Sequence, residues 1–228
     1  GIPFLFYFLP GVLIGYFLMP RRLKNGFLLL VSLLFYAWGE PRYVFLMAVS
    51  ILLFWAYGLA IEKSNYKKHW LTAAIVTGAA MLAVFKYADF AVENFNQIAG
   101  LGLPLLKLAL PIGISFYTFQ CMSYAEDVYR GDTKAQRNLI DFGTYVALFP
   151  QLIAGPIVRY VDVEKELKDR KTTWEDLFAG LFGFLIGLGK KVLLANPFGE
   201  LTNIFRDSGE KSVLFYWLYA VAFTLHIY

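Results

Sequence analysis

A polar stripe runs through residues 110–132, LPIGISFYTFQCMSYAEDVYRGD. On a helix that turns by about 100° per residue, four side chains fall within an arc of about 80°: Ser115, Ser123, Glu126 and Arg130. Gln120 and Asp127 lie beside that arc. Hydroxyl, amide and charged groups gathered on one helix face can hold a polar ligand, so the stripe is a candidate functional surface.

The other side of the same segment is apolar. It carries Ile114, Tyr117, Cys121, Tyr124, Ala125 and Val128. We expect Pro111 to be the first helical residue, because its missing N–H costs nothing at that position. An unsatisfied polar group at membrane depth costs several kcal/mol, so the stripe should face other helices or a water-filled cavity. The charges that end it favour the cavity, and contact between helices is the alternative.

A second unusual segment is FPQLIAGPIVRY, residues 149–160. Pro150, Gly155 and Pro156 interrupt its backbone hydrogen bonding, and broken backbone at membrane depth is tolerated only inside protein or against a cavity. Gln151 and Arg159 flank the break and offer donors for an anionic or carbonyl-bearing ligand. The alternative is a proline kink with an arginine at the membrane interface.

The composition indicates that both segments belong to a membrane protein. Of the 228 residues, 58% are hydrophobic and 17% are charged, against about 25% charged in a typical soluble domain. Several charge-free runs approach the roughly 20 residues that span a bilayer: 1–20, 26–39, 43–61, 70–85, 108–125, 142–158, 177–189 and 212–228. The chain is therefore predicted to be an all-α, polytopic integral membrane protein, with the lipid bilayer as its solvent.

The composition also excludes some classes of partner and bond. No basic motif indicates binding to nucleic acid. The single cysteine, Cys121, excludes a disulfide within the chain, and its place on an apolar helix side favours a structural role.

The distribution of lysine and arginine predicts the orientation. Basic residues follow the first run at 21–24 and the third at 63–68, so the positive-inside rule places both loops in the cytoplasm and the N-terminus outside. The fourth helix then returns outward and should end near residues 86–89. Residues 89–99, DFAVENFNQIA, suit a short interfacial helix ended by Gly100, with an ordinary loop as the alternative.

The orientation of the second half depends on one segment. Residues 159–171 contain five basic residues and favour the cytoplasm, as do Lys190 and Lys191, which we expect to end a glycine-rich helix. Both cytoplasmic placements are possible only if one intervening segment does not cross the membrane. The interrupted run 142–158 is the best candidate.

Four segments carry a resemblance to a known family. LPIGISFYTFQCMSYAEDVYRGD and FPQLIAGPIVRY closely resemble two N-terminal signatures of the membrane-bound O-acyltransferase family, nearest to the bacterial alginate O-acetyltransferase group. LLFYAWGEPRYVFLM and GFLIGLGKKVLLAN are similar to further segments of that group. The likeness runs in order along essentially the whole chain.

The resemblance implies a fold, a reaction and a set of lining residues. Helices would surround a tunnel, and an acyl group from a cytoplasmic thioester donor, acetyl-CoA or another acyl thioester, would reach a hydroxyl of an extracellular polysaccharide. Periplasmic or extracellular partner proteins would assist, and neither a covalently bound cofactor nor a metal is implied. The candidate tunnel-lining or substrate-lining residues are Ser115, Gln120, Ser123, Glu126, Asp127, Arg130, Gln151 and Arg159.

The family's catalytic histidine has no match within these residues. In the family it lies beyond a YxDFSGYSD-like segment, whereas this chain reaches FTLHIY, so the histidine is expected beyond Tyr228. Residues 1–228 are accordingly predicted to be a single membrane domain, the N-terminal part of a longer enzyme of the inner membrane, and inactive alone. His69 lies in a basic loop, and His226 lies in an apolar run that favours a packed, hydrogen-bonded histidine.

Two other functions are compatible with these patterns. A transporter or channel also uses broken helices, here around Pro150 and Pro156, and polar stripes along a substrate path. Such transporters usually contain a paired second broken helix, and no convincing partner segment is found. A membrane scaffold without catalysis is the weakest interpretation.

Overall fold

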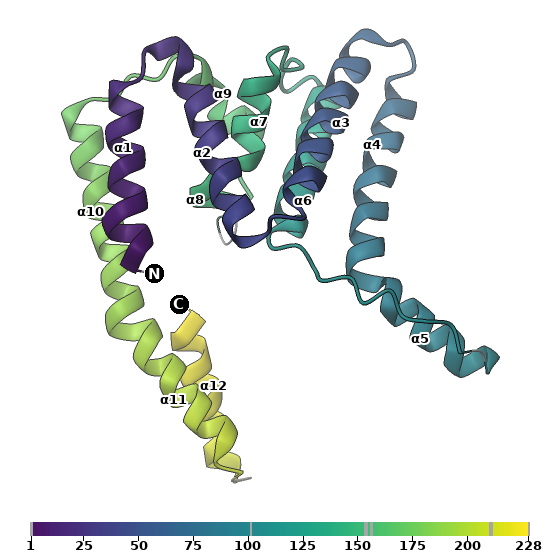
Figure 1. Cartoon of the computed structure of the whole chain (residues 1–228), viewed down its shortest axis with the longest axis vertical. Coiled ribbons are helices and arrows are strands. Elements are labelled where there is room, and N and C mark those ends of the chain that lie inside the picture. Colours follow the sequence, from purple (N-terminus) through teal and green to yellow (C-terminus); the bar gives the residue numbers. More distant parts are fainter. Residues whose placement is uncertain (1, 101, 153–154, 156, 210–211, 228) are drawn as a thin grey trace. The chain divides into compact units, whose positions relative to one another are not determined.

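The computed structural model describes residues 2–100, 102–152, 155, 157–209 and 212–227. The part of the chain that it describes is helical, without strands, as the composition predicts (Figure 1). The chain divides into two compact units, residues 1–170 and 171–228. The prediction of a single membrane domain over 1–228 stays a prediction, and each unit is described here by itself.

The first unit is a group of packed helices. Its elements are a π-helical turn at Phe4–Phe8, α1 (Leu9–Leu18), a 3₁₀ turn at Arg21–Leu23, α2 (Lys24–Gly39), α3 (Val44–Lys63), α4 (Lys67–Leu82), a π-helical turn at Ala83–Tyr87, α5 (Ala88–Ala99), α6 (Ile114–Arg130), α7 (Leu139–Ala147), α8 (Phe149–Leu152) and α9 (Tyr160–Lys168). Helix α6 packs against α3 and α4, and α7 packs against α2 and α3.

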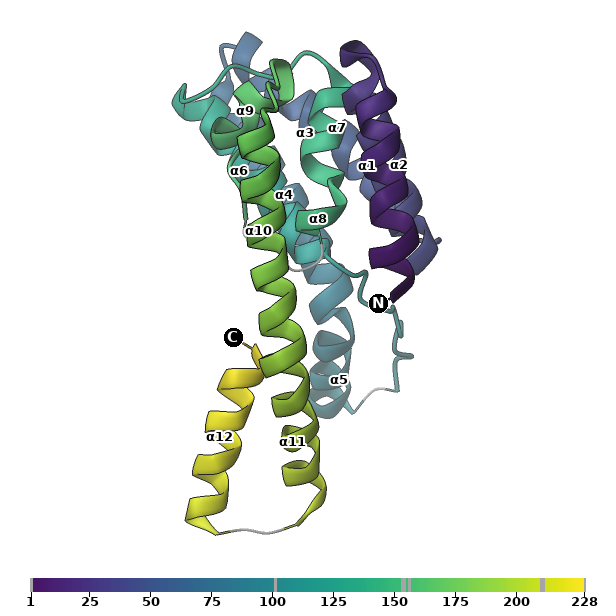
Figure 2. The ribbon, with the colours of Figure 1, turned by 90° about the vertical axis from the view of Figure 1, so that its left-hand side faces the viewer.

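The second unit is formed by three further helices. They are α10 (Trp174–Lys190), a π-helical turn at Lys191–Ala195, α11 (Asn196–Asp207) and α12 (Val213–Ile227). Helices α11 and α12 lie side by side as an antiparallel pair in both views (Figures 1 and 2).

Three continuous helices in the described residues are long and apolar enough to cross a membrane: Val44–Lys63, Lys67–Ala99 and Trp174–Asp207. Two shorter apolar helices, Phe4–Leu18 and Val213–Ile227, accompany them. Large apolar side chains of α10 and α12 point outward, as Phe178, Phe182 and Trp217 do. An outward apolar surface suits lipid, so the prediction of a polytopic helical membrane protein is confirmed.

The core of the first unit lies between α3, α6 and α7. All six residues predicted for the apolar side of α6 are buried there: Ile114, Tyr117, Cys121, Tyr124, Ala125 and Val128. They pack among Met47 and Phe54 of α3 and Phe142 and Tyr145 of α7. The prediction from the 3.6-residue period is therefore confirmed, including the buried, structural position of Cys121.

The predicted start of α6 is wrong. Pro111 is buried in a turn before the helix, and its carbonyl accepts a hydrogen bond from the Ile114 N–H at 3.2 Å. Gly113 precedes the first helical residue with φ +77°, a left-handed conformation that favours glycine. A Cβ at position 113 would also lie 2.7 Å from the Leu152 carbonyl oxygen. Glycine is thus required where the backbone before α6 approaches α8.

Two predicted helix ends are also wrong. The fourth helix does not stop near residues 86–89, because it continues through the π-helical turn into α5 as one helix, Lys67–Ala99. No glycine or proline occurs between Gly78 and Gly100, so nothing in this stretch stops the helix. Likewise, the helix containing Lys190 and Lys191 continues to Asp207. Long basic side chains can reach water from a continuing helix, and their charge alone does not end one.

The segment 88–99 is helical, as predicted, and Gly100 ends it with φ +66°. Its position at a membrane interface stays a prediction.

The interruption predicted within residues 142–158 is confirmed for the part that is described. Helix α7 ends at Ala147, and α8 contains only four residues. At 1.5 Å per residue, the nine residues of α7 extend for about 14 Å, less than half of a bilayer core of about 30 Å. Pro156, the last residue of the predicted break, lies outside the described residues.

Candidate functional site

The main-chain carbonyl of Tyr145 is the centre of a polar cluster beside the break. It accepts hydrogen bonds from Gln120 Nε2 at 2.9 Å and from Gln151 Nε2 at 2.7 Å. Tyr145 lies in the last turn of α7, where carbonyls lack partners within the helix. The two glutamine amides supply the missing donors. They thereby hold the end of α7 between α6 and α8.

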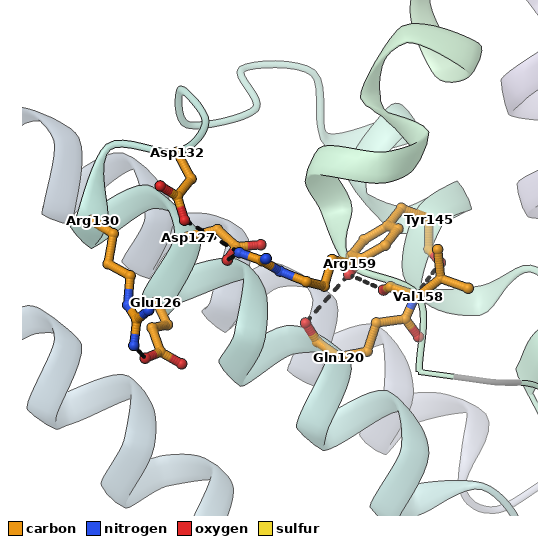
Figure 3. Close-up of polar contacts among 8 residues, drawn as sticks. All are labelled: Gln120, Glu126, Asp127, Arg130, Asp132, Tyr145, Val158 and Arg159. Carbon is orange, nitrogen blue, oxygen red and sulfur yellow. Dashed lines mark hydrogen bonds and ion pairs between the residues drawn. The ribbon is translucent and has the colours of Figure 1, made fainter.

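The Tyr145 side chain fixes the chain after the break. Its hydroxyl donates to the Val158 carbonyl at 2.8 Å, and the residue is only 1% exposed (Figure 3). Figure 3 also shows the hydroxyl near the Gln120 carbonyl, at a longer 3.5 Å. Val158 immediately precedes Arg159, so the buried tyrosine sets the place from which the Arg159 side chain extends.

Arg159 joins two carboxylates from the end of α6. Its Nη2 atom contacts Asp127 Oδ1 and lies 3.2 Å from Asp132 Oδ2 (Figure 3). The Asp127 side chain is only 4% exposed, whereas those of Arg159 and Asp132 are about half exposed. The hydrogen bond to Asp127 and the attraction of its charge raise the pKa of the Arg159 guanidinium above its ordinary value. The guanidinium therefore covers a buried negative charge at the surface of the unit.

A left-handed turn brings the second carboxylate back to this pair. Gly131 follows α6 with φ +84°, and the Gly131 and Asp132 N–H groups both donate to the Asp127 carbonyl, at 3.1 and 3.0 Å. This closes the end of the helix in the manner of a glycine C-cap. Asp132 is thus folded back toward Arg159.

A second layer of contacts supports the turn. The Tyr124 hydroxyl accepts from the Gln136 N–H at 2.9 Å, and Gln136 Nε2 donates to the Tyr160 hydroxyl at 2.8 Å. The Tyr160 ring also packs edge to face against the rings of Tyr124 and Tyr145. The Phe142 ring contacts the same two tyrosines. The connection between α6 and α7 is therefore held to the start of α9, the residue after Arg159.

Glu164 fastens the same connection to α9. Its carboxylate accepts a hydrogen bond from Thr133 Oγ1 at 2.7 Å and pairs with Lys168. Partial burial alone would raise the pKa of Glu164, but the hydrogen bonds from Lys168 and Thr133 outweigh it and lower that pKa. Glu164 stays ionised here and contributes to holding the loop.

Six of the eight predicted site residues fall into two groups. Gln120, Asp127, Gln151 and Arg159 meet around Tyr145 and the end of α6. Glu126 and Arg130 instead pair with each other, one turn apart on an exposed face of α6. Ser115 is half-buried near the start of α6 and joins neither group.

Part of the stripe borders a groove. Ser123 and Glu126 line it with side chains of α4, α6 and the segment after the break, and its volume is about 320 Å³. The remaining lining residues are Ile75, Phe119, Met122 and Ile157. A groove of this size, apolar with two polar groups, could accept a small acyl chain. The tunnel-lining role of the predicted residues stays a prediction.

Tyr145 and Asp132 were missed as members of the cluster. Asp132 stands in the charged end of the opening segment, and Gly131 before it was the available signal of a returning turn. Tyr145 acts through its main-chain carbonyl and its buried hydroxyl, and no sequence signal marks the role of the carbonyl. Among the described residues, no group of three or more His, Cys, Asp and Glu side chains is placed to hold a metal ion.

Comparison with known proteins gives matches along the chain. It is 39% identical over 233 aligned residues to the "Probable alginate O-acetylase AlgI" of Pseudomonas aeruginosa, and 38% identical to the protein of the same description from Azotobacter vinelandii. It is also 30% identical to the "Peptidoglycan O-acetyltransferase" of Helicobacter pylori. Each alignment covers 99% of this chain. The chain is homologous to the AlgI-type membrane O-acetylases.

The homology to the AlgI-type proteins is limited in length. The chain spans about half the length of the curated relatives it matches, with 45% of the Pseudomonas protein and 50% of the Helicobacter protein covered. No family model matches the chain. No solved structure gives a significant match. The resemblance to the membrane-bound O-acyltransferases noted in the sequence is confirmed by these relatives.

Proposed function

We propose that this chain is part of a membrane enzyme that transfers an acetyl group to hydroxyl groups of a polysaccharide outside the cytoplasm. The observation that carries the proposal is its similarity to relatives described as acting on two different glycans, alginate and peptidoglycan. O-acetylation is what these descriptions have in common. The higher identity to the alginate proteins favours an alginate-like acceptor.

The helical structure supports a membrane enzyme in particular. Long apolar helices carry outward-facing apolar side chains, and the first unit contains a broken segment held by a buried polar cluster. A transporter was the alternative interpretation of that break. The similarity to O-acetylases favours acyl transfer, since it concerns the whole chain and the break is only one short segment.

For the acyl donor we propose a thioester such as acetyl-CoA, supplied from the cytoplasm. Figure 1 shows the α1–α2 turn, the α3–α4 turn and the α6–α7 connection at one end of the first unit. Lysine and arginine residues lie in these segments or in the helix turns beside them, among them Arg22, Lys67 and Arg137. The positive-inside rule favours a cytoplasmic location for that end, and basic side chains there would attract an anionic donor. Periplasmic or extracellular partners would complete delivery to the polymer.

The test is an acetyl-transfer assay with the natural protein that contains this chain. Membranes holding it are supplied with acetyl-CoA labelled in the acetyl group, and ester-linked label on alginate is measured with and without mild alkali, which removes O-acetyl esters. Base-labile label on the polysaccharide supports the proposal. Label on neither alginate nor peptidoglycan, in membranes that contain the intact protein, contradicts it. The same assay on residues 1–228 alone tests the prediction that they are inactive.

A further inference from the structure

The second unit contains a polar cleft between two helices whose other faces are apolar. Its volume is about 360 Å³, within the range typical of small-molecule sites. Helix α11 contributes Asn196, Gly199, Glu200, Thr202, Asn203 and Arg206, and α12 contributes Phe223 and His226. Apolar residues of the same helices point elsewhere, with Ile204, Trp217 and Val221 all strongly exposed. In a lipid environment, polar side chains gather in this way where they meet water, protein or a ligand.

The polar side chains of α11 form one row. Asn196, Glu200, Asn203 and Arg206 are spaced by four, three and three residues, which places them on one helix face. Within the described part of the chain, neither Glu200 nor Arg206 has an ion-pair partner, and neither asparagine side chain is hydrogen bonded. Their hydrogen-bonding groups are therefore available to a molecule in the cleft.

The His226 ring has a defined orientation in the cleft. Its Nδ1 atom lies 2.8 Å from the Ala195 carbonyl oxygen. A carbonyl only accepts hydrogen bonds, so Nδ1 carries the hydrogen, and Nε2 of the neutral ring is left as an acceptor. The contact confirms the hydrogen bond predicted for this histidine, whereas the prediction that its side chain is packed is wrong, because the residue is exposed. The contact also leaves one ring nitrogen free to accept.

Gly199 makes that orientation possible. A Cβ at position 199 would lie 2.6 Å from His226 Nδ1 and 2.7 Å from its Cε1. Real Cβ atoms do not approach so closely, so any larger residue would displace the imidazole. The glycine and the histidine thus form one fitted contact between α11 and α12.

The mixture of donors and acceptors selects a class of ligand. Glu200 and His226 Nε2 present acceptors, Arg206 presents donors, and each asparagine amide presents both. The anionic oxygens of phosphate only accept hydrogen bonds, so they leave Glu200 and His226 Nε2 without a donor. A sugar of alginate also carries a carboxylate, but this group can pair with Arg206 while the hydroxyl groups donate to Glu200. A sugar hydroxyl donates and accepts, and the Phe223 ring offers an apolar face for the C–H groups of a sugar ring.

We propose that this cleft binds a hydroxyl-rich carbohydrate, a short stretch of the polysaccharide acceptor. The inference rests on the proposed function for the identity of the carbohydrate. It adds a location for acceptor binding and names His226, Glu200 and Asn203 as contact residues.

The test measures the reactivity of His226 in the natural protein that contains this chain, purified in detergent. Diethyl pyrocarbonate modifies unprotonated imidazole nitrogens, and peptide mass spectrometry follows each histidine separately. Residues 1–228 contain two histidines, so His69, exposed in the first turn of α4, is an internal control. We expect a short alginate oligosaccharide to slow modification of His226 several-fold and to leave His69 unchanged. Inorganic phosphate should slow neither.

Matched variants separate specific binding from general shielding. Glu200→Gln should reduce the protection of His226, whereas Glu93→Gln, an exposed glutamate of α5, should not. Gly199→Ala should displace the ring and remove protection, whereas Gly187→Ala, where an added Cβ meets nothing within 4 Å, should retain it.

Each outcome bears on the inference separately from the proposed function. Equal modification of His226 with and without oligosaccharide, in the folded wild-type chain, overturns the cleft assignment even if acetyl transfer is found. Equal protection by phosphate overturns it in favour of an anion site. Protection without any acetyl transfer by the natural protein supports the cleft and contradicts the enzyme assignment.

Discussion

Arg159 forms an ion pair with Asp127, a residue 32 positions earlier whose side chain is only 4% exposed. The pair joins the segment after the break to the last turns of α6. Because the carboxylate is buried and the guanidinium is half exposed, the two partners are not equivalent. Removing the arginine leaves a buried charge without compensation, whereas removing both charges does not.

The first prediction follows from this asymmetry. Arg159→Ala should lower the thermal unfolding midpoint of the detergent-solubilised chain by several degrees, and Asp127→Asn added to it should restore most of that loss. The measurement is a thermal melt of all four members of the double-mutant cycle. Arg137→Ala is the control, because its partner Glu62 lies 3.4 Å away and the arginine is 72% exposed. That variant should change the midpoint little.

A double mutant no more stable than Arg159→Ala would contradict the inference that the arginine neutralises Asp127. The arginine would then contribute mainly through packing of its side-chain stem.

The second prediction separates positioning from ligand contact. If Arg159 only holds Asp127 and the α6 turn, the Asp127→Asn, Arg159→Ala double mutant should regain acetyl transfer together with stability. If the guanidinium contacts a carbonyl or carboxylate of a ligand, we expect stability to recover and transfer to remain strongly reduced. Arg159→Lys should then be folded and nearly as inactive as Arg159→Ala, because lysine offers a point charge instead of a planar fork. Transfer is measured in the natural protein.

We expect the ligand-contact outcome, in which Arg159→Lys is folded and has little activity. A fully active Arg159→Lys variant would exclude a fork-specific contact and favour an anchoring role.

The sequence predicted which side of α6 is buried, because apolar side chains at helical spacing must leave water together. It did not predict Tyr145 as the centre of the cluster. A carbonyl needs side-chain donors only where its helix ends, and the end of α7 is decided by packing against α2, α3 and α6. The helix ends near Lys86 and Lys190 were misplaced for a related reason. Charge was taken as a stop signal. The stretch around Lys86 has no glycine or proline, and the helix that contains Lys190 continues even past Pro197.

The third prediction concerns the contact between α3 and α6. A Cβ at Gly58 would lie 2.5 Å from the Tyr124 hydroxyl oxygen, in a core where Tyr124 is fully buried. Gly58→Ala should therefore destabilise the chain by about 1–3 kcal/mol, the usual range for overpacking. Equilibrium unfolding in a mixed detergent measures the change in free energy.

Gly180→Ala is the matched control, since its added Cβ would have no neighbour within 4 Å and alanine favours helix. If Gly58→Ala is as stable as the control, α3 and α6 are not packed as closely as the structure shows.

The last prediction concerns orientation. In the first unit the α1–α2 turn, the α3–α4 turn, the α6–α7 connection and α9 lie at one end, and the α2–α3 turn lies toward the other (Figures 1 and 2). If the N-terminus is outside, as the basic residues predict, the first group of segments is cytoplasmic. Single cysteines are placed in a Cys121→Ala background at Lys24, Lys67, Arg137 and Lys165, with Glu40 as the exterior control. A membrane-impermeant thiol reagent added to intact cells should label only position 40, and all five positions should react after the cells are opened.

Positions 137 and 165 decide the role of the break, because α7 and α8 lie between them. If position 137 is shielded and position 165 is labelled, the broken segment crosses the membrane, contrary to our prediction. If positions 24 and 67 are labelled in intact cells while position 40 is not, the whole orientation is inverted.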